Sequence, residues 1–123
     1  MHLVDTSAVI ELIYGTEKGA EVRQKIHSEP IFLSSLTIHE LLVGLKEKEV
    51  EALEQFFKEV SVLEFDSKAA FKSAMIEKAL RQKGAMINKV DILIAGTCLV
   101  HNATLIGCDG GFTNIPELRS III

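Results

Sequence analysis

The sequence predicts an α/β protein with a mostly parallel central sheet of four or five strands and helices on both faces. Short apolar strands, such as 31–33, alternate along the chain with helical segments. A half-exposed strand would alternate polar and apolar residues, and these strands do not. Both faces of the sheet are therefore expected to be covered by helices.

The expected elements follow one another without an internal repeat or a long linker. Strands are expected at 2–4, 31–33, 61–65, 103–107 and 119–123. Helices are expected at 7–14, 17–27, 36–60 with a break near 44–49, 67–83 and within 88–102. Gly84 marks the end of the helix at 67–83, because glycine commonly follows a helix end. The last helix is apolar around nearly its whole circumference, which places it inside the fold.

Size and composition indicate the class of the protein. The chain has 123 residues, of which 48% are hydrophobic and 24% charged, and this suits one compact domain, residues 1–123. No apolar stretch approaches the ~20 residues of a membrane helix, and no secretory signal is visible, so we expect a cytoplasmic protein with no membrane association. Cys98 and Cys108 form no metal-binding motif, and we expect both to be free thiols.

The net charge argues against one class of nucleic-acid binder. A formal charge of -4 excludes a simple basic clamp, because affinity for phosphate normally comes from lysine and arginine side chains that displace counterions. A role in nucleic-acid chemistry therefore requires positive charge from another source.

Four acidic residues occur where the chain is expected to meet one edge of the sheet. Asp5 and Asp109 follow predicted strands, whereas Glu40 and Asp91 are expected near helix starts. Ligands of parallel α/β sheets bind beyond the carboxyl ends of the strands. If the four acids converge there, they either take up protons or hold a cation. Oxygen ligands of this kind suit Mg²⁺ or Mn²⁺ rather than zinc or copper.

Each acid also has a purely structural explanation. Asp5 is placed to cap the helix that follows it, and Glu40 stands three residues after Thr37, as in a capping box. Asp91 is expected in the first turn of a helix, where the helix dipole favours an anion. Asp109 precedes two glycines in a sequence typical of an Asx turn. The interpretation as a functional site depends on the four acids together.

Four motifs give the chain a resemblance to a known family. They are LVDTS at 3–7, LTIHELLVGL at 36–45, KVDILIAGTCL at 89–99 and TLIGCDGGF at 104–112. Over essentially its whole length the chain resembles the PIN domain, and in compactness and spacing it is similar to the VapC-like toxins of type II toxin–antitoxin systems. The expected fold is then a PIN-like α/β/α sandwich. The fourth motif departs from the family, which often has threonine where this chain has Gly107.

The resemblance implies a metal-dependent endoribonuclease that hydrolyses RNA by activated water. Its acidic cluster would comprise Asp5, Glu40, Asp91 and Asp109, with Thr6 or Ser7 as a polar neighbour. One or two Mg²⁺ or Mn²⁺ ions would bind mainly to Asp5 and Asp91. Asp109 would complete the site directly or through water. Glu40 would either orient or deprotonate the attacking water, or bind the metal directly.

The resemblance also implies partners: an RNA substrate, a small antitoxin that covers the acidic pocket, and a second copy of the chain in a homodimer. Arg81, Lys83 and Lys89 are candidates for contact with RNA phosphates, although each also fits a solvated helix end. Phe56 and Phe57 are candidates for a dimer surface, although core packing is the simpler explanation.

Other functions are compatible with the same fold. One is a noncatalytic binding module, and another is a PIN nuclease of RNA processing or decay. A receiver-type phosphoacceptor domain is disfavoured, because the acidic pair and the late lysine that it needs are missing. His39 adjoins Glu40, but neighbouring helix residues point about 100° apart. A serine nucleophile is also unsupported, because Ser7 lacks a glycine elbow.

Overall fold

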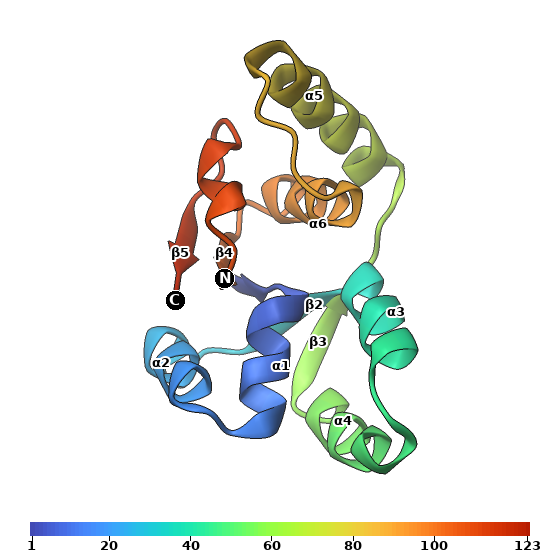
Figure 1. Cartoon of the computed structure of the whole chain (residues 1–123), viewed down its shortest axis with the longest axis vertical. Coiled ribbons are helices and arrows are strands. Elements are labelled where there is room, and N and C mark those ends of the chain that lie inside the picture. The colour runs from blue at the N-terminus through green and yellow to red at the C-terminus, as the bar shows by residue number, and fades with distance from the viewer.

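The computed structural model describes residues 1–123, the whole chain, as an α/β protein with one central five-stranded sheet (Figure 1). The strands are β1 (His2–Val4), β2 (Ile31–Ser34), β3 (Val60–Leu63), β4 (Thr104–Gly107) and β5 (Ser120–Ile122). Their order is β3-β2-β1-β4-β5, and every neighbouring pair is parallel. The predicted sheet is thus confirmed, and it is parallel throughout.

Six α-helices and two short 3₁₀ helices surround the sheet. The α-helices are α1 (Thr6–Tyr14), α2 (Glu17–Ile26), α3 (Ser35–Gly44), α4 (Val50–Phe57), α5 (Ser67–Lys83) and α6 (Lys89–Val100), and the 3₁₀ helices are η1 (Glu47–Glu49) and η2 (Gly110–Asn114). Each predicted element is present within a few residues of its expected bounds, including the break after Gly44. None of the helices has both the length and the apolar character that crossing a membrane requires.

Two hydrophobic cores cover the two faces of the sheet. Leu3 and Val4 are neighbours on β1, so their side chains point to opposite faces. Val4 packs in a core formed with residues of α1, α2 and α4, whereas Leu3 packs in a core formed with residues of α5 and α6. Both side chains are fully buried, and each such burial contributes about 1.5–3 kcal/mol. The predicted coverage of both faces by helices is confirmed.

Phe56 and Phe57 belong to the first of these cores. Phe56 on α4 is buried, and Phe57 is half-buried against the same cluster. Core packing, the simpler of the two explanations, therefore accounts for both side chains.

The strand order reverses beside β1. The chain adds β2 and β3 on one side of β1, and β4 and β5 on the other. Val4 at the end of β1 pairs in register with Ile106 near the end of β4. The carboxyl ends of β1 and β4 therefore lie level at the position where parallel sheets bind ligands. Asp5 follows the first of these strands, and Asp109 lies two residues beyond the second.

The start of α3 corrects one prediction. Ser34 caps this helix, and its hydroxyl accepts a hydrogen bond from the Leu36 amide at 3.1 Å. Thr37 therefore does not cap the helix, and Glu40 lies in the middle of α3 rather than near its start. The capping-box interpretation of Glu40 is wrong, because the serine at the end of β2 already caps the helix.

Candidate active site

Asp5 joins the end of β1 to the start of α1. Its Oδ1 atom accepts a hydrogen bond from the Ala8 amide at 2.9 Å, as the predicted helix cap requires. The Ser7 hydroxyl donates to the same carboxylate and lies 2.8 Å from Oδ1 and 3.0 Å from Oδ2. Ser7 Oγ in turn accepts a hydrogen bond from the Cys108 amide at 3.0 Å. This hydroxyl therefore links the ends of β1 and β4.

Thr6 brings Glu40 towards the same end of the sheet. The Thr6 hydroxyl, on the first residue of α1, donates to Glu40 Oε1 at 2.5 Å. It also lies 3.2 Å from the hydroxyl of Thr37, which is buried on α3 one turn before Glu40. Thr37 was not singled out as a site residue in the sequence. Its position three residues before Glu40 could have indicated a role beside that acid. In the sequence, this spacing was instead interpreted as a capping box.

Asp109 starts the turn after β4. Its Oδ1 atom accepts a hydrogen bond from the Gly111 amide at 2.8 Å, which confirms the predicted Asx-type turn. A Cβ atom on Gly111 would lie 2.8 Å from the Ile87 side chain. The turn with Asp109 therefore packs closely against the segment that leads into α6, the helix with Asp91.

Asp91 lies in the first turn of α6, as predicted, and Asn88 caps that helix through a hydrogen bond from the Val90 amide at 2.9 Å. Burial raises the pKa of the half-buried Asp91 carboxyl to about 6, and the negative charges of Asp5, Glu40 and Asp109 add to the effect. The Asp91 carboxyl therefore lies within electrostatic reach of the other three acids.

Asp5 responds to the same surroundings. Burial raises the pKa of its carboxyl, and the charges of Asp109 and Glu40 act in the same direction. The hydrogen bonds from Ala8 and Ser7 oppose this rise, because they stabilise the carboxylate. None of the four acids forms a salt bridge with a basic side chain. The cluster therefore carries uncompensated negative charge.

The acidic cluster suits a divalent cation by its chemistry. All its donors are carboxylate oxygens, the ligands that Mg²⁺ and Mn²⁺ prefer, and no basic side chain forms a salt bridge with them. In this arrangement no three side chains of histidine, cysteine, aspartate or glutamate are placed to hold one ion together.

The basic residues near α6 interact with groups other than the four acids. Arg81 Nη2 lies 2.8 Å from Glu77 Oε2, and Lys89 Nζ lies 2.6 Å from Glu77 Oε1. Lys83 Nζ lies 3.5 Å from the main-chain oxygen of Asn114. All three candidate RNA contacts therefore already have partners within the chain, and none of them neutralises the acids.

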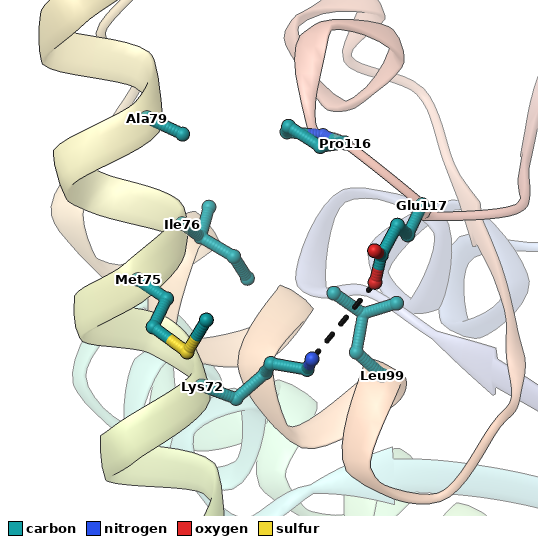
Figure 2. A pocket seen from close by; sticks show the side chains of 7 residues that line it. All are labelled: Lys72, Met75, Ile76, Ala79, Leu99, Pro116 and Glu117. Carbon is teal, nitrogen blue, oxygen red and sulfur yellow. Dashed lines mark ion pairs between the residues drawn. The ribbon is translucent and has the colours of Figure 1, made fainter.

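A separate apolar cavity lies between α5, α6 and the segment after η2 (Figure 2). Lys72 Nζ lies 3.9 Å from Glu117 Oε2 in this cavity. Its lining comprises Lys72, Met75, Ile76, Ala79, Leu99, Pro116 and Glu117. None of the four acids lines it, so it is not part of the candidate site.

Comparisons with known proteins identify the family. Residues 2–118 match the model of the PIN domain, and the chain belongs to that family. The resemblance that the four sequence motifs predicted is thus confirmed.

The relatives of this chain within the family are named as ribonucleases. The chain is 32% identical to Ribonuclease VapC19 of Mycobacterium tuberculosis over 122 residues, which cover 97% of this chain and 98% of the relative. It is 27% identical to the tRNA(fMet)-specific endonuclease VapC of Salmonella typhimurium, over 76% of this chain and 75% of the relative.

A solved structure shares the whole architecture. The structure of VapBC2 from Rickettsia felis, bound to a DNA fragment from its promoter, contains a chain that matches this one with a TM-score of 0.89 and 25% identity. The match covers 99% of this chain and 98% of that chain. The expected PIN-like fold is therefore confirmed over essentially the whole sequence.

Proposed function

We propose that this protein is a metal-dependent endoribonuclease of the VapC type and the toxin of a toxin–antitoxin pair. The ribonuclease relatives and the shared fold support this function. The observation that carries the metal dependence is the uncompensated charge of four acids from four separate segments at the carboxyl edge of the sheet. We propose that residues 1–123 act as one nuclease domain.

Asp5 and Asp91 are the proposed principal metal ligands, because Asp5 is buried, Asp91 is half-buried and both carboxyls have a raised pKa. Asp109 completes the site, directly or through water. These carboxylates would hold one or two ions. The chemistry that bound Mg²⁺ or Mn²⁺ supplies is charge neutralisation of the phosphodiester and a lower pKa for the attacking water.

Glu40 is the proposed acceptor for the proton of that water. The hydrogen bond from Thr6 engages Oε1, and Oε2 is then the oxygen that receives the proton. Thr6 orients this carboxylate through its hydrogen bond, and Thr37 contacts the Thr6 hydroxyl. Direct coordination of the metal by Glu40 is the alternative role, and it predicts that Glu40→Gln weakens Mn²⁺ binding as well as cleavage.

A cleavage assay tests the proposed function. Purified protein is incubated with structured RNA in Mg²⁺ or Mn²⁺, with and without a chelator, and the ends of the products are analysed. We expect 3′-hydroxyl and 5′-phosphate ends, and loss of cleavage with the chelator and in Asp91→Ala. Glu77→Gln is the matched control, because Glu77 is an acid near the same helix whose charge is already balanced. Cleavage that persists in Asp91→Ala would contradict the proposal.

The proposed partners are RNA, a small antitoxin and a second copy of the chain. The Rickettsia felis structure is of a VapBC complex, which supports an antitoxin partner by similarity. Co-expression with the product of the neighbouring small reading frame should give a copurifying complex and suppress cleavage. Light scattering after size-exclusion chromatography tests the homodimer, whose expected mass is twice the 13.6 kDa of one chain.

A further inference from the structure

Gly107, the last residue of β4, lies directly against the Asp5 carboxylate. A Cβ atom at position 107 would be 2.9 Å from Asp5 Cγ, 2.9 Å from Oδ2 and 3.1 Å from Oδ1. Carbon atoms in ordinary van der Waals contact are about 3.5–4.0 Å apart. A side chain at this position therefore does not fit beside the carboxylate as it now lies.

The backbone of Gly107 does not itself require glycine. The glycines with positive φ are Gly15 and Gly84, and Gly107 is not among them. An alanine would therefore adopt the same strand conformation without strain. All three of the nearest atoms that its Cβ would meet belong to the Asp5 side chain. The need for glycine at this position comes from one carboxylate.

The Asp5 carboxylate has little freedom to move away. It is held by the Ala8 amide and by the Ser7 hydroxyl, and that hydroxyl is itself fixed by the amide of Cys108. A side chain at 107 must displace the carboxylate from these donors. Displacement would move Asp5 relative to Asp109 and Glu40, whose charges act on it.

We infer that Gly107 is a positioning residue, whose missing side chain lets the Asp5 carboxylate lie over the end of β4, where it joins the acidic cluster. The Ser7 hydroxyl contacts both carboxylate oxygens, so the carboxylate is held in this place. The role at the metal site rests on the proposed function, whereas the contact with Asp5 does not.

The metal-dependent part of the test compares Gly107→Ala with Gly44→Ala. Gly44, the last residue of α3, has no positive φ, and its added Cβ would meet no atom within 4 Å. We expect Gly107→Ala to weaken Mn²⁺ binding, measured by calorimetry, and to slow RNA cleavage, each by on the order of 10- to 100-fold. Gly44→Ala should change neither by more than about twofold, since substitutions that make no close contact have small effects.

The metal-free part of the test is a double-mutant cycle on thermal stability. We expect Gly107→Ala to lower the Tm of the wild-type chain, and to lower it much less in the Asp5→Ala background, because the atoms that collide are then absent. If Gly107→Ala folds poorly on its own, the cycle remains informative, because the added Asp5→Ala substitution should then restore folding in the double mutant.

The outcomes separate the two proposals. If Gly107→Ala lowers the Tm equally in the wild-type chain and in Asp5→Ala, the inference is overturned, because the new Cβ would then not collide with Asp5. Coupling in the cycle with unchanged Mn²⁺ affinity and cleavage in Gly107→Ala would overturn the positioning role at the site. A wild-type protein that takes up no Mn²⁺ and cleaves no RNA would contradict the proposed function, and the cycle would still decide whether Gly107 holds Asp5.

Discussion

Two charged residues of α6 lie two positions apart and have opposite surroundings. Lys89 forms an ion pair with Glu77, which Arg81 also contacts. The hydrogen bond and charge of Lys89, with the charge of Arg81, lower the pKa of Glu77. Asp91, by contrast, is half-buried beside three other acids, and its pKa rises to about 6. In the Glu77 cluster, which comprises Glu77, Arg81 and Lys89, the one carboxylate is paired with two cations, whereas the acidic cluster around Asp91 lacks positive charge.

This difference separates a structural cluster from a candidate functional one. Glu77 is satisfied by its neighbours, so folding alone explains its position. The carboxylates around Asp91 repel one another, and burial disfavours their charged form. Both effects lower the stability of the folded state. Perturbed carboxyls gathered in this way are typical of functional sites. Substitutions in the acidic cluster should therefore affect metal binding and cleavage, whereas substitutions in the Glu77 cluster should not.

The largest expected effect is on cleavage. Asp91→Asn should reduce the rate of RNA cleavage by on the order of 100- to 1000-fold, because it removes a ligand from a metal that contributes several kcal/mol to catalysis. Glu77→Gln should change the rate by less than about threefold, since exposed ion pairs contribute little. Initial rates in Mn²⁺ measure both effects. Equal losses in the two variants would remove the distinction between the clusters.

The next effect is on stability in the presence of metal. Mn²⁺ at about 100 times its Kd should stabilise the wild-type protein by about 2.7 kcal/mol and raise its Tm by on the order of 10 °C. Glu77→Gln should keep this rise, whereas Asp91→Asn should lose most of it. Thermal unfolding followed by circular dichroism, with and without a chelator, gives the values. A full rise in Asp91→Asn would show that the ion binds elsewhere.

A smaller effect concerns the pH dependence of the metal-free protein. Between the ordinary value of 3.8 and about 6, folded Asp91 keeps a proton that the unfolded chain has lost. The free energy of unfolding should therefore fall as pH rises through this range. After allowance for solvent screening of a half-buried group, the loss is about 1 kcal/mol.

Asp91→Asn should remove that part of the pH dependence. Urea unfolding at pH 4.5 and pH 7 measures it, and Glu54→Gln on the exposed face of α4 is the control for the loss of one acid. Asp5, whose pKa is also raised, adds to the slope in the same direction and should remain in Asp91→Asn. An identical slope in wild type and Asp91→Asn would contradict the raised pKa.

The smallest expected effect is the change in stability when the Glu77 cluster is altered. Glu77→Gln should lower the Tm by at most about 2 °C, because Arg81 and Lys89 are exposed and can turn to solvent. The change should shrink further in high salt, which screens exposed ion pairs. A much larger fall would show that the Glu77 cluster holds α5 and α6 together.

Local signals were sufficient to predict most of the fold. The apolar strands, the cap at Asp5 and the end of α5 at Gly84 all follow from rules about a few neighbouring residues. Gly84 has the positive φ of 67° that its position after the helix requires. The start of α3 was predicted to within one residue, but its capping residue was not, because propensity alone does not decide between Ser34 and Thr37.

The convergence of the acids needed more than local signals. The order of the strands in the sheet decides which strand ends are neighbours. No short segment of sequence encodes this order, so the expectation that the acids converge depended on the resemblance to the PIN domain. The pairing of Lys89 with Glu77 was also out of reach, because it depends on how closely α5 and α6 pack. That packing is tight enough for a Cβ on Gly96 to lie 2.8 Å from the Ser73 side chain.

The most direct measurement is a crystal structure of the protein grown with Mn²⁺, with anomalous diffraction recorded to locate the ion. We predict an anomalous peak between the carboxylates of Asp5 and Asp91, at ligating distance from both, and none near Glu77. A Mn²⁺ ion bound away from these two side chains, or no ion at a concentration that supports RNA cleavage, would contradict the metal site proposed for this protein.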